Sequence, residues 1–227
     1  MATPFEDPDD PQHSVRLAIL VAAAGGDAGA AYGYVSELLG RGVSFPDILF
    51  GVLAPLEAEV GQRWQQGDFS ISEEHAVTAT LETVVALLAG SFDSAPDARR
   101  VVVACAEGDV HSLAARMIAA HLVFLGWRVS FLGPSQPADD LGAYLQENPP
   151  EALVLSCTLA AALPGARASI RAAHAPGSRC SPGAMASAPT AGGRAPWAPT
   201  PGPPIPGRST PSSAPGSRTR ATPGSST

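Results

Sequence analysis

The chain has 227 residues, of which 45% are hydrophobic, so it carries enough apolar material for a packed core. Residues 1–151 hold all 21 acidic groups and seven arginines, and this acidic body disfavours direct binding to DNA. The three cysteines (Cys105, Cys157 and Cys180) have no disulfide or metal spacing, and neither a signal peptide nor a membrane span is visible, which predicts a cytoplasmic protein.

The N-terminal half predicts a helical region. Residues 1–11 are acidic and rich in proline, which predicts a flexible N-terminus. Residues 12–93 have a helical pattern broken by glycine-containing joints at 25–26, 40–42 and 67–68, and four helices fit between these joints. Ser44 and Ser70 each precede an acidic residue by three positions, which predicts that they are N-caps. We therefore expect a four-helix bundle, whose last helix covers roughly residues 70–89.

The pattern then changes to alternating strands and helices. Residues 100–105 form a β-branched run typical of a strand buried on both faces. A helix over 112–125, a strand over 127–132, a helix over 138–146, a strand over 152–156 and a helix from 163 follow. This order predicts a flavodoxin-like, doubly wound parallel sheet over residues 99–173, with its binding crevice at the carboxyl ends of the strands. With only three strands, the sheet is predicted to be truncated.

The last segment, residues 174–227, has a different composition. It holds 12 of the 23 prolines and no acidic residue, valine, leucine, phenylalanine or tyrosine. Such a segment buries too little apolar surface to order itself, so we expect a disordered tail. A GC-rich gene read in a shifted frame produces this mixture of residues, and a natural disordered tail is the alternative.

The sharpest local pattern follows the first predicted strand. Asp109 and His111 lie between that strand and the next helix, at the binding end of the sheet. A neutral imidazole is a good transition-metal ligand, and a carboxylate that accepts its other N–H fixes the ring. The pattern therefore makes His111 a candidate metal ligand supported by Asp109. An ordinary loop histidine is the alternative.

These residues resemble a known motif. Asp109-x-His111-x-x-Ala114 is similar to the Asp-x-His-x-x-Gly signature of cobalamin-binding domains, as in methionine synthase, corrinoid methyltransferase proteins and cobalamin mutases. The resemblance implies that His111 is the lower cobalt ligand and that Asp109 supports it. Ala114 stands where the family has glycine, so a methyl group is expected where the backbone and the corrin tail come close.

A second element of the same family follows the third predicted strand. Ser156-Cys157-Thr158-Leu159 resembles the family's Ser-x-Thr/Leu element, which implies that Ser156 and Thr158 line the slot for the nucleotide tail. A helix cap is the alternative interpretation of these two hydroxyls. The family's double glycine lacks a convincing counterpart, because no predicted strand leads into Gly192-Gly193.

The helical region carries a third set of residues. The spacing of Trp64, Glu74 and His75 resembles the cap of light-dependent cobalamin repressors that control carotenoid synthesis. The resemblance implies that Trp64 shields the adenosyl group, Glu74 contacts it, and His75 takes the upper cobalt site after photolysis. Ordinary bundle packing for Trp64 and an exposed helix start for the other two is the alternative.

Together these patterns predict a cobalamin-binding sensor, rather than an enzyme, that holds adenosylcobalamin and acts on transcription through a protein partner. The chain resembles the sensor half of the repressors, without their DNA-binding domain. A corrinoid carrier of a methyltransferase system, holding methylcobalamin, is one alternative, and an inactive frame-shifted copy is another. A homo-oligomer is compatible with each.

Overall fold

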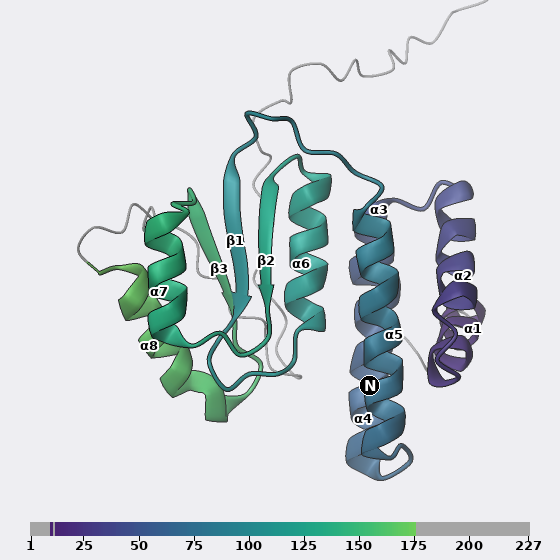
Figure 1. Ribbon diagram of the computed structural model, residues 1–227. Helices are drawn as coiled ribbons and strands as arrows, with labels where there is room; N and C mark the ends of the chain where they lie inside the picture. The colour runs from purple at the N-terminus through teal and green to yellow at the C-terminus, as the bar shows by residue number, and fades with distance from the viewer. Residues whose placement is uncertain (1–9, 11, 176–227) are drawn as a thin grey trace, which may run out of the picture. The chain divides into compact units, whose positions relative to one another are not determined.

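The computed structural model describes residue 10 and residues 12–175 (Figure 1). The predicted flexible N-terminus lies outside these residues except for Asp10, whose carboxylate accepts a hydrogen bond from Arg16 Nη1 at 2.7 Å. The predicted tail lies outside them from residue 176 onward, as do Cys180 and the Gly192-Gly193 pair.

The helical region consists of four rods, as predicted. The first two are α1 (His13–Ala24) and α2 (Ala28–Gly40). The third joins α3 (Phe45–Asp47), the π-helical segment η1 (Ile48–Leu53) and α4 (Ala54–Gln66), and the fourth is α5 (Ile71–Ala89). Their apolar faces share one core, to which all four rods contribute fully buried side chains, including Ile19, Val35, Leu49, Val60 and Leu81. We call these four rods the cap.

Two helix starts of the cap have the predicted serine caps. Ser44 Oγ accepts a hydrogen bond from Asp47 N at 3.2 Å. Ser70 Oγ accepts one from Glu73 N at 3.2 Å, while the Glu73 carboxylate accepts from Ser70 N at 2.8 Å, which completes a capping box. The hydrogen bonds that the Glu73 carboxylate accepts from Ser70 N and Ser70 Oγ lower the pKa of Glu73. Between α4 and α5 the chain turns at Gly67, whose φ of 84° strongly favours glycine.

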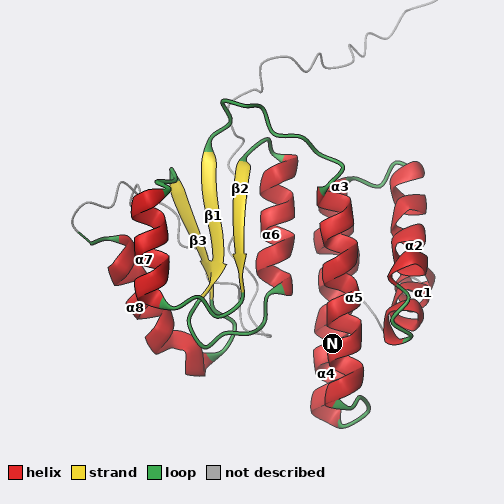
Figure 2. Cartoon of the chain, in the orientation of Figure 1, coloured by secondary structure: helices red, strands yellow, loops and turns green. Residues whose placement is uncertain are grey.

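The second half is an α/β domain with the predicted alternation (Figure 2). Its elements are β1 (Arg100–Cys105), α6 (Leu113–Phe124), β2 (Arg128–Gly133), α7 (Ala138–Glu147), β3 (Ala152–Ser156), the 3₁₀ turn η2 (Ala160–Ala162) and α8 (Leu163–Ala173). The described sheet has three parallel strands in the order β2-β1-β3, so β1 is central. Side chains of α7 and α8 pack on one face of the sheet and those of α6 on the other.

Helix α6 takes part in two cores. Ala115 and Ala119 pack against the sheet with Val101 and Val103. A second set of buried side chains on α6, at positions spaced by three or four residues, belongs to the core of the cap: Leu113, Met117 and Ala120. Helix α6 therefore lies beside α5 and joins the cap to the α/β domain (Figure 1).

Among the described residues, no helix combines the length and the apolar character needed to cross a membrane.

Candidate functional site

The predicted motif lies in the loop between β1 and α6, at the carboxyl end of the central strand. This loop is fixed from the side of β2. Ser135 N donates to the Asp109 carbonyl at 2.9 Å, and Gly108 N donates to Ser135 Oγ at 3.1 Å. Gly108 has a φ of 85°, which favours glycine at this bend. The loop therefore presents its side chains from a fixed backbone.

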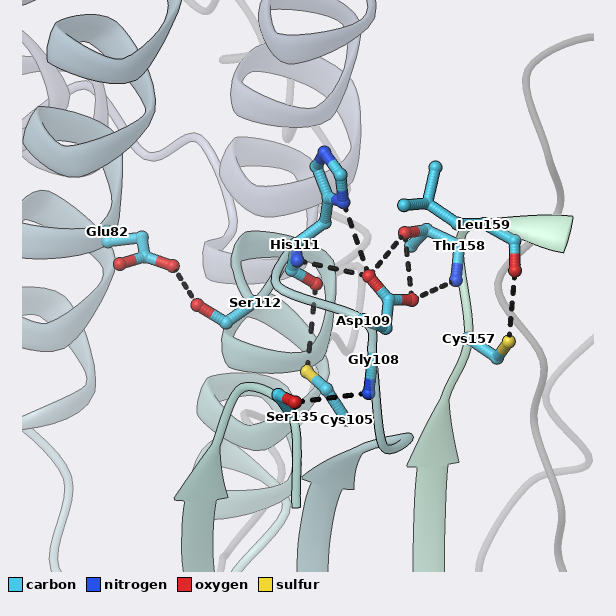
Figure 3. Close-up of polar contacts among 10 residues, drawn as sticks. All are labelled: Glu82, Cys105, Gly108, Asp109, His111, Ser112, Ser135, Cys157, Thr158 and Leu159. Atoms are coloured by element: carbon cyan, nitrogen blue, oxygen red, sulfur yellow. Dashed lines mark hydrogen bonds and ion pairs between the residues drawn. The ribbon is translucent and has the colours of Figure 1, made fainter. Parts of the chain in front are cut away.

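Asp109 is the buried centre of the site (Figure 3). Its Oδ1 accepts hydrogen bonds from His111 N at 3.0 Å and from Thr158 Oγ1 at 2.9 Å, and its Oδ2 accepts from Thr158 N. Burial alone would raise the pKa of Asp109, but the hydrogen bonds from Thr158 and His111 outweigh burial and hold that pKa below its ordinary value. Asp109 is therefore an ionised acceptor at neutral pH.

His111 is oriented by this carboxylate. Its Nδ1 lies 3.2 Å from Asp109 Oδ1, and because an ionised carboxylate only accepts, Nδ1 carries the proton. The other ring nitrogen, Nε2, then has a free lone pair, and the His111 side chain is 52% exposed. A buried carboxylate behind an exposed imidazole is the arrangement that holds a histidine as a metal ligand. The donor set at this position therefore fits a transition-metal ion such as cobalt, with His111 as the residue that would hold it.

Two exposed apolar side chains lie near His111. Val110 precedes it in the chain, and Leu159 lies near it in space (Figure 3). Val110 is 66% exposed, and Leu159, which follows Thr158, is 41% exposed. Figure 3 shows Leu159 on the same side of the strand ends as the imidazole. Exposed apolar groups around a polar ligand atom are typical of a binding site for a large, partly apolar molecule. A corrin has this character.

The other two residues predicted in the α/β domain are less exposed. Ser156 ends β3, and its Oγ is buried without a hydrogen-bond partner among the described residues, which leaves one hydroxyl available to a bound group. Ala114 lies half-buried in the first turn of α6. The structure thus brings His111 and Thr158 each into contact with Asp109, while tail binding by Ser156 and Thr158 stays a prediction.

The predicted cap residues lie at the joint between α4 and α5. Trp64 is 46% exposed near the end of α4. Glu74 Oε2 and His75 Nε2 are 3.4 Å apart in the first turn of α5, and the His75 side chain is 74% exposed. Within the described part of the chain, no hydrogen bond or ion pair connects these residues to His111. They therefore form a second group, on the cap.

A stripe of polar side chains follows Glu74 along α5. Thr78 lies one turn further and donates to Glu57 Oε1 and to Glu74 Oε1, both at 3.1 Å. Glu82 lies one more turn along and accepts a hydrogen bond from Ser112 Oγ, the residue that follows His111. From Glu74 to Glu82 the helix rises about 12 Å. The stripe therefore leads from the cap residues to the His111 loop.

Sequence reasoning missed Glu57, Thr78, Glu82 and Ser112. The spacing of 74, 78 and 82 places these three residues on one helix face, which the sequence could have shown. The contacts of Glu82 with Ser112 and of Thr158 with Asp109 join residues 30 and 49 positions apart, and no local pattern reports such pairs.

Glu57 makes the stability of the protein depend on pH. Its pKa is raised to about 7, mainly by burial and in part by the nearby Glu74 and Glu82, against the hydrogen bond from Thr78, which lowers it. Between pH 4.5 and 7 the unfolded chain releases this proton while the folded chain keeps it, so stability falls as pH rises through this window. We expect Glu57→Gln to remove about 2–3 kcal/mol of the difference in unfolding free energy between pH 5 and pH 8.

Urea unfolding of the cofactor-free protein at both pH values measures this difference. Glu37→Gln, at an exposed position of α2, is the matched control and should leave the difference unchanged. An equal pH dependence in wild type and Glu57→Gln would show that Glu57 is ionised in the folded protein.

Comparison with known proteins agrees with this arrangement. Residues 16–89 and residues 99–180 each match a family model described as a B12 binding domain. A 93-residue stretch is 39% identical to the HTH-type transcriptional repressor CarH of Myxococcus xanthus, and covers 40% of this chain and 30% of the repressor. A 100-residue stretch is 33% identical to the repressor CarA of the same organism, and covers 44% of this chain and 33% of that protein.

The fold itself is also found in a solved structure. The monomethylamine corrinoid protein of Methanosarcina barkeri superposes with a TM-score of 0.60 over 74% of this chain and 81% of its own, at 16% identity. The matches to the two repressors cover about a third of their length, whereas the two domain models together account for most of this chain. The chain therefore belongs to the cobalamin-binding proteins that are built from B12-binding domains.

Proposed function

We propose that the protein is a light-responsive sensor that holds adenosylcobalamin between the cap and the α/β domain and acts on transcription through a protein partner. The observation that carries the proposal is the second group of residues, Trp64, Glu74 and His75, at one joint of the cap. A site that only carried a corrinoid would need His111 and Asp109 but not this group. The similarity to CarH and CarA supports the same choice.

Each residue of the cap joint has a role that follows from its chemistry. The exposed indole of Trp64 offers a flat apolar cover, and Glu74 accepts hydrogen bonds from hydroxyl groups. His75 is a latent metal ligand, because its imidazole is largely exposed and its Nε2 lies at the surface beside Glu74 Oε2. When bound, adenosylcobalamin supplies a cobalt–carbon bond that light can break. Loss of the group that Trp64 covers then leaves the cap free to change its position.

The experiment compares dark and illuminated protein. We expect protein loaded with adenosylcobalamin in the dark to change its absorbance spectrum and its elution volume after green light. Trp64→Ala should weaken the change in elution volume, and His75→Ala should change the spectrum of the illuminated form. Leu87→Ala, another exposed apolar position of the cap away from the α4–α5 joint, is the control for Trp64.

The alternative is a corrinoid carrier of a methyltransferase system, whose fold is represented by the Methanosarcina barkeri protein. A carrier should bind methylcobalamin or hydroxocobalamin as readily as adenosylcobalamin and keep one elution volume in darkness and light. That result would replace the sensor with the carrier. Absence of corrin binding under all conditions would exclude both roles and favour an inactive copy.

A further inference from the structure

The interface between the cap and helix α6 has two different ends. At the C-terminal end of α6, the ring of Phe124 packs against the rings of Phe45 and Phe92, with centroids 5.3 and 5.2 Å apart. At the N-terminal end, Ser112 Oγ donates a hydrogen bond to Glu82 of α5. The interface is thus aromatic at one end, apolar in the middle and polar at the end beside His111. Figure 3 shows the polar end, where Ser112 meets Glu82.

The polar end adjoins the predicted cobalt ligand in the chain. Ser112 follows His111 directly and is itself 6% exposed. The His111 backbone is held from the α/β domain, through its N–H to Asp109 Oδ1 and through its carbonyl, which accepts from Cys105 Sγ at 3.6 Å. The bond from Ser112 to Glu82 holds the same loop from the cap, and it is the one hydrogen bond between α5 and this loop within residues 12–175.

The two ends respond differently to a displacement of α5. Apolar side chains such as Met117 tolerate a small slide along the interface, because apolar burial has no preferred direction. A hydrogen bond weakens steeply once its distance or angle leaves a narrow range. A displacement of α5 therefore either breaks the bond of Glu82 to Ser112 or moves the His111 loop with it.

We propose that Glu82 is a positioning residue that couples the cap to the lower cobalt ligand by holding Ser112. With the bond intact, the His111 loop keeps one position relative to α5, so that His111 would be held ready for the metal. With the bond broken, the loop is held by the α/β domain alone, and His111 ligation weakens. The inference rests on the proposed role of His111 as a cobalt ligand.

The test reads the ligand directly, in protein loaded with hydroxocobalamin and reduced to the cobalt(II) state. An axial nitrogen splits the electron paramagnetic resonance signal of cobalt(II), and labelling the protein's histidines with nitrogen-15 changes that splitting only where a histidine, and not the cofactor's own base, is the ligand. The spectrum of the labelled protein therefore gives the ratio of His111-bound to His111-free cofactor. The spectra are recorded after equilibration at several temperatures, because the ratio can be measured only where both forms of the cofactor are populated. The unfolding temperature of each cofactor-free variant reports general destabilisation separately.

We expect Glu82→Ala and Ser112→Ala each to lower the bound-to-free ratio about tenfold. This factor corresponds to the lower end of the free energy that one hydrogen bond to a charged group contributes. The double variant should be no worse than either single one, because both remove the same bond. Glu82→Gln keeps an acceptor oxygen for Ser112 and should restore most of the ratio. Glu37→Ala, the same kind of loss at an exposed position of the cap, should have no effect.

Three results would overturn the inference: a wild-type ratio in Ser112→Ala, additive effects in the double variant, or no rescue by Glu82→Gln. Should Glu82→Ala fail to fold, the Ser112→Ala and Glu82→Gln variants carry the decision. A wild-type signal without splitting by a histidine nitrogen is a different outcome, because it would remove His111 itself as the ligand and with it the proposed site.

Discussion

Replacing His111 with alanine is expected to abolish histidine ligation of the cobalt of bound cobalamin. The imidazole is oriented by Asp109, its Nε2 is the exposed lone pair at the end of the central strand, and alanine offers no donor in its place. Loss of a residue that hydrogen-bonds to a metal ligand typically lowers the affinity for the metal by about 10- to 100-fold. Loss of the ligand itself should cost at least as much. Absorbance spectra and equilibrium titration with hydroxocobalamin measure both effects.

The matched control is His174→Ala. His174 follows α8 in the same domain and is exposed, so its loss removes an imidazole without touching the His111 loop. The control variant should keep the wild-type spectrum and affinity. A His111→Ala protein with the wild-type spectrum would show that cobalt takes its lower ligand elsewhere, and the site would have to be abandoned.

A second large effect is expected from Gly165→Ala in the first turn of α8. A Cβ at this position would lie 2.1 Å from the carbonyl oxygen of Glu107 and 2.9 Å from its carbonyl carbon, because the helix packs directly on the loop after β1. Backbone atoms cannot move aside as a flexible side chain can. We expect the free energy of unfolding to fall by about 3 kcal/mol, at the upper end for overpacking.

Gly61→Ala is the control for this substitution. Gly61 lies within α4, and a Cβ there would meet nothing within 4 Å, so alanine should stabilise the helix by up to about 1 kcal/mol. Urea unfolding of the cofactor-free proteins gives both values. If the two variants were equally stable, α8 would not pack on the Glu107 carbonyl as described, and the shape of the strand ends would need revision.

The fold was largely predictable from the sequence because its local patterns agree with its packing. In the α/β domain the predicted strand over 152–156 is observed unchanged, and the predicted helix over 112–125 differs by one residue at each end. In the cap, the serine caps and the glycine joints mark the helix ends correctly. Each of these patterns is decided within a few residues of chain, where the sequence carries the information.

Some packing could not be predicted in this way. Ala79 has the spacing of the apolar face of α5 but is exposed, whereas Thr80 is buried and bonds to the Ala23 carbonyl of α1. The π-helical segment Ile48–Leu53 rotates the buried face of α4, which follows it, and nothing in the residue types of the segment signals this change. The burial of Thr80 and the rotation after the π-helical segment both depend on where a neighbouring helix lies, and this position cannot be predicted from a single sequence.

The candidate site shows the same division. The pairing of Asp109 with His111 could be predicted, since the two residues are two positions apart and their chemistry is complementary. Thr158 was predicted as a contact of the corrin tail, which stays a prediction, and the structure shows a different role, a hydrogen bond that Thr158 donates to Asp109. That second role depends on β3 lying beside β1, which places the two strand ends together.

The double membership of helix α6 bears on how such proteins can be recombined. Its residues Leu113, Met117 and Ala120 complete the core of the cap, although they belong in sequence to the α/β domain. A gene fusion that joined this α/β domain to a different cap would leave these side chains in water unless the new cap presented a matching groove. Exchange of whole modules is therefore constrained by one helix face, and caps and α/β domains of this kind are expected to be inherited together.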